Sequence, residues 1–274
     1  MRPRWRNARC YANVIKIVNG KVLIVTGSTG IGAAAARRAA AEGARVLIAT
    51  ADEISGFELA AETGAVCWTG DLRTPGAADS VLSHCLARFG RLDALFHVAG
   101  LSGRRFGDGP LHEIDDDGWE NALASNLGIA FRMCRAALGR MMVQAPAEDG
   151  TRGSIVAIGS VLAEAPESKH FATHGYAAAK GALAAMCRSM AAYYAPHGIR
   201  VNVIAPGVAG TPAAERTHAD HDLQELVRRR QPLTAGMIPV DDIASAALFL
   251  LGPGARAITG EVLTIDAGWR LSGE

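Results

Sequence analysis

The chain has 274 residues, of which 49% are hydrophobic and 20% are charged. This composition is too apolar for a disordered chain and suffices for the core of one large α/β domain. The formal net charge of +1 gives no basic excess, which argues against nucleic acid as a partner. No apolar run reaches the ~18 residues that a membrane-spanning helix needs, so we expect no membrane association.

The N-terminal stretch differs from the rest because it carries basic residues and no acid. The basic residues before position 17 are Arg2, Arg4, Arg6, Arg9 and Lys16. The stretch has no apolar region of a secretory signal and no serine, which a transit peptide would contain. We therefore expect residues 1–19 to be a basic, flexible tail. The alternative is that the segment results from translation that starts at an upstream start codon. Residues 20–274 would then form the folded domain.

The cysteines and histidines show no spacing that indicates a metal site or a disulfide framework. The five cysteines are scattered along the chain: Cys10, Cys67, Cys85, Cys134 and Cys187. Such a pattern is typical of reduced thiols in a cytoplasmic protein. We therefore expect a cytoplasmic protein that binds no metal.

After residue 20, short apolar runs alternate with helical segments. Seven runs are predicted strands, at residues 21–26, 45–49, 65–69, 94–98, 154–158, 201–205 and 262–265. Continuous β-branched and aliphatic runs separated by helices are typical of a parallel sheet that is covered on both faces. The pattern predicts a single α/β domain, doubly wound (Rossmann), with a seven-stranded parallel sheet and helices on both faces. A longer charged segment at residues 208–232 is the candidate substrate lid.

A glycine-rich turn follows the first predicted strand and leads directly into an alanine-rich helix at residues 31–42. It consists of Gly27, Ser28, Thr29, Gly30, Ile31 and Gly32. Glycines in this context allow backbone N–H groups to approach a pyrophosphate at a helix N-terminus. We therefore expect a nucleotide-binding site here, with an ordinary glycine-rich turn as the alternative.

Tyr176 and Lys180 are four residues apart in an alanine-rich segment that is expected to be helical. This spacing places both side chains on one helix face. An ammonium group beside a phenol is expected to lower the phenol pKa from ~10 toward neutral pH. Tyr176 would then be able to serve as a general acid or base.

The glycine turn and the Tyr176 and Lys180 pair belong to a series of motifs along the chain. In this order and spacing, the motifs resemble those of the short-chain dehydrogenase/reductase family. They are the glycine turn, Asp71-Leu72, His97-Val98-Ala99-Gly100, Asn126, Ser160, Tyr176 with Lys180, Pro206-Gly207 with Thr211, and the segment from Thr259 to Gly268. The resemblance covers residues 20–270. It implies a nicotinamide cofactor and hydride transfer to or from an alcohol or ketone.

Two features depart from the compact branch of that family, which the sequence otherwise resembles. Only Ser28 and Thr29 separate the first two glycines of the turn, where compact members have three residues. The shorter spacing is also found in longer, epimerase-like relatives. The second departure is His97-Val98, which replaces the family's usual pair of asparagines, so the pocket is expected to be less rigid.

The resemblance implies a role for each residue that matches a family motif in the site. Tyr176 would be the acid or base, Lys180 would lower its pKa and hold the nicotinamide ribose, Ser160 would bind the substrate oxygen, and Asn126 would order a water beside Lys180. The implied cofactor contacts are Gly27, Ser28, Thr29, Gly30, Ile31, Gly32, Thr50, Asp71, Leu72, Ala99, Gly100, Tyr176, Lys180, Pro206, Gly207 and Thr211. Ser160 as a turn cap and Asn126 as a helix breaker are the alternatives.

The choice between NAD and NADP depends on the end of the second predicted strand. Thr50 stands where an acid would select NAD, and Thr29 stands where NADP enzymes often carry a basic residue. The lack of a basic residue favours NAD. Asp52 is expected to cap the next helix rather than bind the ribose. Asp71 would hold the adenine ring, with a turn or helix cap as its alternative.

These motifs do not specify the substrate, the assembly or the exact reaction. Arg104, Arg105 and His112 would favour an anionic or polar substrate if they face the pocket; solvated loop charges are the alternative. The helix at residues 181–194 is where family members usually dimerise, so a homodimer or homotetramer is expected. An epimerase or dehydratase with bound NAD(P), or a silent nucleotide-sensing protein, are the other functions considered.

Overall fold

The computed structural model of this chain describes residues 17–272, apart from the side chain of Arg105. The predicted basic tail at residues 1–19 therefore lies almost entirely outside the described residues. Within them, the structure contains no helix that is both long and apolar enough to cross a membrane.

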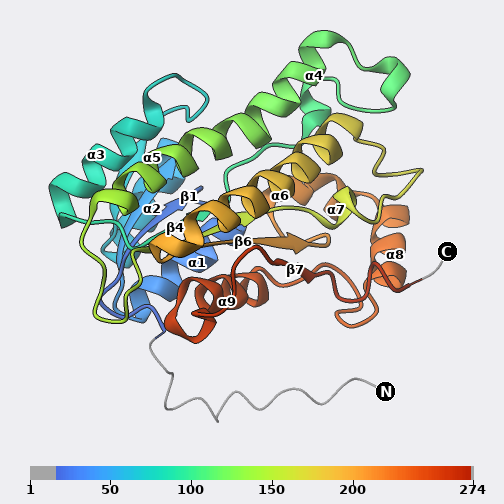
Figure 1. Cartoon of the computed structure of the whole chain (residues 1–274). Coiled ribbons are helices and arrows are strands. Elements are labelled where there is room, and N and C mark those ends of the chain that lie inside the picture. The colour runs from blue at the N-terminus through green and yellow to red at the C-terminus, as the bar shows by residue number, and fades with distance from the viewer. Residues whose placement is uncertain (1–16, 273–274) are drawn as a thin grey trace.

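Seven parallel strands form one sheet, as the sequence predicts (Figure 1). They are β1 (Val22–Thr26), β2 (Arg45–Thr50), β3 (Val66–Thr69), β4 (Ala94–His97), β5 (Gly153–Ile158), β6 (Ile199–Pro206) and β7 (Val262–Ile265). Their order across the sheet is β3-β2-β1-β4-β5-β6-β7. The order reverses between β1 and β4, and such a switch point is where doubly wound sheets bind ligands.

Nine α-helices connect and cover the strands of the described chain. They are α1 (Gly30–Ala41), α2 (Glu53–Thr63), α3 (Ala77–Phe89), α4 (Asp116–Leu123), α5 (Ile129–Val143), α6 (His174–Tyr194), α7 (Glu215–Ala219), α8 (His221–Arg230) and α9 (Val240–Leu251). Helices α1 and α9 pack on one face of the sheet, and α3, α5 and α6 pack on the other (Figure 1). The prediction of a doubly wound domain is confirmed.

The strands form where they do because their side chains are buried on both faces. All five residues of β1 and all eight of β6 are buried, and alternate side chains enter the two separate core clusters. Small alanine side chains let α1 lie close to the sheet and to α9. Burial of such apolar surface is the main stabilising term of the fold.

The candidate lid at residues 208–232 is folded into α7 and α8 and is fastened at its C-terminal end by Gln231. This side chain is fully buried and forms hydrogen bonds at both ends of its amide group. Its Oε1 accepts the N–H of Val208 at 2.6 Å, and its Nε2 donates to Val208 O at 3.0 Å and to Gly236 O at 2.7 Å. The segment therefore returns to the sheet next to the end of β6.

Candidate active site

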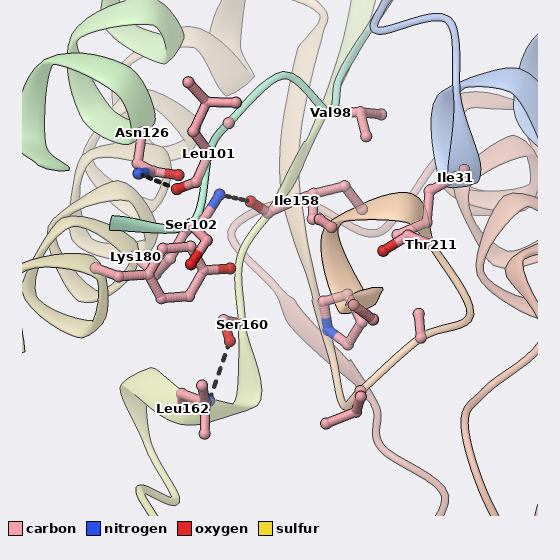
Figure 2. Close-up of a pocket in the computed structure, with 18 of the residues that line it drawn as sticks. Ile31, Val98, Leu101, Ser102, Asn126, Ile158, Ser160, Leu162, Lys180 and Thr211 are labelled. Atoms are coloured by element: carbon pink, nitrogen blue, oxygen red, sulfur yellow. Dashed lines mark hydrogen bonds between the residues drawn. The ribbon is translucent and has the colours of Figure 1, made fainter. Parts of the chain in front are cut away.

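A cavity of about 340 Å³ opens at the carboxyl ends of β1, β4, β5 and β6. It is lined by most of the residues that the sequence nominated: Gly27, Thr29, Gly30, Ile31, Ala99, Gly100, Asn126, Ser160, Tyr176, Lys180, Pro206, Gly207 and Thr211. Figure 2 shows Ser160, Lys180 and Asn126 in one part of the site, with Ile31 and Thr211 across from them. Residues from six separated segments are thus brought together.

Lys180 is held rigidly at the base of the site by the strand beneath it. Its Nζ donates a hydrogen bond to Ile158 O at 2.8 Å and lies 5.5 Å from the centre of the Tyr176 ring. The side chain of Lys180 is buried. Ser160 begins a short 3₁₀ turn after β5, and its Oγ accepts the N–H of Leu162 at 3.2 Å (Figure 2). The helix places Tyr176 and Lys180 on one face, as the spacing predicts.

The pKa of Tyr176 differs from the prediction. Burial raises the pKa of the Tyr176 phenol above its ordinary value, and a hydrogen bond with Ser160 acts in the other direction. Burial also lowers the pKa of Lys180 to about 8, an effect opposed by the thiol of Cys187. The expected lowering of the Tyr176 pKa is wrong for this structure, because burial disfavours the charged phenolate and is the largest influence on this group.

Asn126 lies in a π-helical turn (Ala124–Gly128) between α4 and α5, not in a regular helix. Its Nδ2 donates to Leu101 O at 2.9 Å and to Ala122 O at 3.0 Å. Its Oδ1 is buried and has no hydrogen-bond partner among the described residues. A Cβ on Gly100 would lie 2.7 Å from this Oδ1 and 3.4 Å from Lys180 Nζ. Glycine therefore keeps open the space between these two polar atoms.

The glycine turn is shaped by close backbone contacts despite its shorter length. Gly27 has a φ of +100°, which favours glycine. A Cβ at Gly32 would lie only 2.4 Å from the carbonyl oxygen of Gly27, and a Cβ at Gly30 would lie 2.9 Å from Thr211 Cγ2. These contacts leave the N-terminus of α1 open toward the cavity, which fits a pyrophosphate group.

Ser28, Thr50, Asp71, Leu72 and Gly32 do not line this cavity. Ser28 Oγ forms hydrogen bonds with the hydroxyl groups of Thr50 (2.8 Å) and Ser55 (2.6 Å), so these three side chains make a polar cluster at the end of β2. Asp52 caps α2 by accepting the N–H of Ser55, as expected.

The two residues after β3 occupy different environments. Asp71 accepts the backbone N–H of Arg73 at 2.8 Å and forms an ion pair with the Arg73 side chain. This geometry is that of a turn and holds the pKa of the Asp71 carboxyl below its usual range. Leu72 is buried in the core. The structure therefore brings the nicotinamide half of the predicted site together in the cavity, whereas Asp71 and Leu72 lie outside it.

His97, which replaces the usual asparagine, ends β4 and is fully buried. Its Nδ1 lies 3.2 Å from Thr26 Oγ1, which also accepts the N–H groups of Val98 and Ala99. Because those bonds use the lone pairs of the hydroxyl, its proton is donated to Nδ1 and the His97 proton lies on Nε2. Nε2 has no partner among the described residues. Burial, and secondly the charge of Lys180, lower the pKa of His97 to about 3.

Of the loop residues considered as substrate contacts, Arg104 lines the cavity, together with Arg216 from α7. His112 is exposed and pairs with Glu113 at 3.4 Å, outside the cavity. The side chain of Arg105 is outside the described part of the chain. Among residues 17–272, no group of three or more His, Cys, Asp or Glu side chains is arranged to hold a metal ion.

Sequence reasoning missed two residues that shape the site. Asp108 is buried and accepts the N–H groups of Gly175 and Tyr176 at 2.9 and 2.8 Å, which fixes the start of α6. Arg216 lies in the lid segment, where no motif distinguishes it from neighbouring charged residues. Neither role could be predicted from local spacing, because each depends on how segments distant in the sequence pack together.

Comparison with known proteins gives the same picture over nearly the whole chain. A family model described as enoyl-(acyl carrier protein) reductase matches residues 25–270. Momilactone A synthase of Oryza sativa subsp. japonica is 34% identical over 264 residues, which cover 94% of this chain and 92% of that protein. The 3-oxoacyl-[acyl-carrier-protein] reductase FabG of Salmonella typhimurium is 34% identical over 253 residues, covering 91% and 97%.

Solved structures share the fold. A crystal structure of 3-ketoacyl-(acyl-carrier-protein) reductase from Brucella melitensis, complexed with NADH, matches with a TM-score of 0.82 and 25% identity. It covers 93% of this chain and all (100%) of that one. The chain therefore belongs to the short-chain dehydrogenase/reductase family and is an NAD(P)-dependent oxidoreductase that acts on hydroxyl or carbonyl groups.

Proposed function

We propose that this enzyme interconverts a secondary alcohol and a ketone, with Tyr176 as the general acid and base. The observation that carries the proposal is the joint placement of Tyr176, Ser160 and Lys180 in one cavity at the switch point of the sheet. A phenol next to a hydroxyl group and an ammonium group is suited to move a proton to or from a substrate oxygen. The bound nicotinamide cofactor supplies the hydride acceptor or donor.

Each residue has a separate task in this proposal. Ser160 Oγ donates to the substrate oxygen and orients it toward the Tyr176 hydroxyl, so that the proton transfers over one hydrogen bond. Lys180, fixed by Ile158 O, stabilises negative charge on the phenol. Asn126 Oδ1, with no protein partner among the described residues, is available to accept a hydrogen bond from a water near Lys180.

The cofactor is assigned to the glycine turn and the cavity beside it. Gly30, Ile31 and Thr211 would hold its pyrophosphate and carboxamide, and Gly100 leaves room for close approach. We propose NAD as the preferred form. The polar cluster at the end of β2 consists of uncharged Ser28, Thr50 and Ser55, and the carboxylate of Asp52 follows it, so a 2′-phosphate would find no cationic partner there.

We further propose that the enzyme is a cytoplasmic homodimer or homotetramer. Cys67, Cys85, Cys134 and Cys187 are free thiols, as expected in a reducing compartment. Helices α5 and α6 expose large apolar side chains, among them Phe131 at 48% and Tyr193 at 66%. Such residues fit an interface between copies of the chain. Light scattering of the purified protein measures the assembly.

The test combines cofactor binding with turnover. The protein is titrated with NADH and with NADPH by fluorescence, and then assayed with a panel of secondary alcohols and ketones. Tyr176→Phe should abolish turnover and leave the Kd for the cofactor nearly unchanged. Tyr193→Phe, on the same helix but outside the cavity, is the control: it removes only a hydroxyl group, keeps the apolar ring at the proposed subunit contact and should keep wild-type activity. Normal turnover by Tyr176→Phe would refute the assignment of the acid and base.

A further inference from the structure

Two arginines line the cavity from different segments of the chain. Arg104 lies in the 3₁₀ turn Gly103–Phe106 after β4, and Arg216 lies in α7 of the lid segment. Burial lowers the pKa of Arg104, and the positive charge of Arg216 lowers it further, while Asp108 acts in the other direction. Two like charges that share one cavity repel each other, and a bound anion would remove that repulsion.

Arg104 is oriented by the loop that follows Ser160. Its Nη2 donates to His170 O at 2.8 Å and to Ala172 O at 3.4 Å. A guanidinium group has five N–H donors, so those on Nε and Nη1 stay available for a ligand. Within residues 17–272, neither Arg104 nor Arg216 forms an ion pair with a carboxylate.

The nearby carboxylates are engaged elsewhere. Asp108 accepts the N–H groups at the start of α6, and Glu164 is paired with Arg270. Glu167 accepts backbone N–H groups of residues 169–171. Glu215, next to Arg216 in the chain, makes no ion pair with either cavity arginine. The two arginines are therefore without an ion-pair partner in the described chain, and the charge of Asp108 offsets only part of that of Arg104.

Much of the remaining wall of the cavity is apolar. Leu162, Phe171 and Leu223 line it, in addition to the reacting residues Ser160 and Tyr176. We propose that the substrate is an oxo or hydroxy acid with an apolar body, whose carboxylate binds Arg104 and Arg216 while its carbonyl or carbinol carbon lies at Tyr176. This inference rests on the proposed function and adds the substrate class to it.

The chemistry stays that of the proposed reaction and balances without a further reagent. In oxidation, the carbinol C–H bond would break with its hydride passing to a bound nicotinamide cofactor, the O–H proton would go to the phenolate of Tyr176, and the C=O bond would form. Reduction is the reverse. The carboxylate does not react; arginine binds it through charge-assisted hydrogen bonds, which are stronger than those between neutral groups.

The experiment compares charged substrates with matched neutral ones. Methyl-ketone acids of six, eight and ten carbons are each assayed beside their methyl esters, with the NADH-bound enzyme. We expect at least one acid to exceed its ester about tenfold in kcat/KM, equivalent to ~1.4 kcal/mol. The binding constant of each acid and ester is measured in parallel by the change in NADH fluorescence. No preference for any acid, including no measurable binding of either form, overturns the proposal.

Arginine variants test whether the preference for acids arises from Arg104 and Arg216. Arg216→Met and Arg104→Met should each remove most of the preference for acids, measured as the ratio of kcat/KM for each acid to that for its ester. Because Arg104 also supports the 164–174 loop, Arg216→Met on the exposed lid is the decisive variant. Arg229→Met in α8 removes the same charge from the same segment but lies outside the cavity, so it is the matched control. An equal loss of preference in Arg229→Met would indicate a general charge effect and refute the site.

The cofactor pyrophosphate is the other anion that these arginines could bind. The Kd for NADH distinguishes it from the substrate carboxylate. The Kd for NADH should be the same in wild type, Arg104→Met and Arg216→Met. A tenfold or larger weakening in Arg216→Met would assign that guanidinium to the cofactor pyrophosphate and overturn the substrate site. Failure of the proposed function looks different, because then neutral ketones would not be turned over either.

Discussion

The carboxylate of Asp108 holds the backbone of Tyr176, with Oδ2 2.8 Å from the Tyr176 nitrogen. The two residues are 68 positions apart in the chain. Asp108 Oδ1 accepts the preceding N–H, from Gly175, at 2.9 Å. Helix α6 begins at His174, and its N-cap Thr173 forms no side-chain cap. A buried carboxylate from another loop therefore replaces the local cap and fixes the first turn, which carries the reacting phenol.

We expect Asp108→Ala to reduce activity through the position of Tyr176. Two buried N–H groups would lose their acceptor, which costs about 1–3 kcal/mol of the free energy of unfolding. The frayed turn should lower kcat roughly tenfold, with little change in the Kd for NADH. Asp115→Ala is the control, since Asp115 caps α4 in a similar way at a site outside the cavity. If both variants lose stability but neither loses kcat, Asp108 is only a structural cap.

Gly32→Ala should weaken cofactor binding. A Cβ at this position would lie 2.4 Å from the Gly27 carbonyl oxygen, which is backbone and has little freedom to move. The turn would have to open, and we expect the Kd for NADH to rise by more than tenfold. Gly139→Ala, in α5, meets no atom within 4 Å and should bind NADH normally. Fluorescence titration measures both. Wild-type affinity in Gly32→Ala would mean that the glycine turn does not hold the cofactor.

Much of the fold could be predicted because its signals are local. The strand predictions ended within one or two residues of the observed bounds, since buried parallel strands are continuous apolar runs. The cap at Asp52 was also predicted correctly. The contact between Asp108 and Tyr176 and the π turn at Asn126 were not, because they depend on tertiary packing. The prediction of a lowered Tyr176 pKa was wrong for a related reason. Sequence spacing shows which groups are neighbours but not how much water surrounds them.

Gln231→Leu should loosen the lid segment. The substitution keeps the volume but leaves the N–H of Val208 without its acceptor, and it removes one of the two donors to each of the carbonyl groups of Val208 and Gly236. We expect faster proteolysis within residues 208–232 and a higher KM, with a loss of about 2 kcal/mol or more in stability. Gln224→Leu, at an exposed position of α8, is the matched control, because it removes a single exposed hydrogen bond, to His218 O, within the same segment. Equal protease sensitivity in the two variants would contradict this role.

His97 should make the enzyme sensitive to mild acid. Its pKa is lowered to about 3 in the folded protein, because the ring is buried and lies near the charge of Lys180. In the unfolded chain it would titrate near ~6.5. As the pH falls below that value, the unfolded chain binds a proton that the folded one does not, so the free energy of unfolding decreases. The stabilising contribution is complete above the unfolded pKa and is lost progressively as the pH falls toward the folded pKa.

The effect of His97 on stability is large enough to measure by urea unfolding. Between pH 7 and pH 5, His97 should remove about 2 kcal/mol of stability, since each pKa unit corresponds to ~1.4 kcal/mol. His97→Asn keeps a hydrogen-bond acceptor for Thr26 and has no titrating ring, so urea unfolding should show a smaller decrease over the same range. Comparing the two proteins at each pH cancels the contribution of all other groups that do not contact the site. An identical decrease in both proteins would place the acid sensitivity elsewhere and show that His97 is already protonated, or exposed to water, at pH 5.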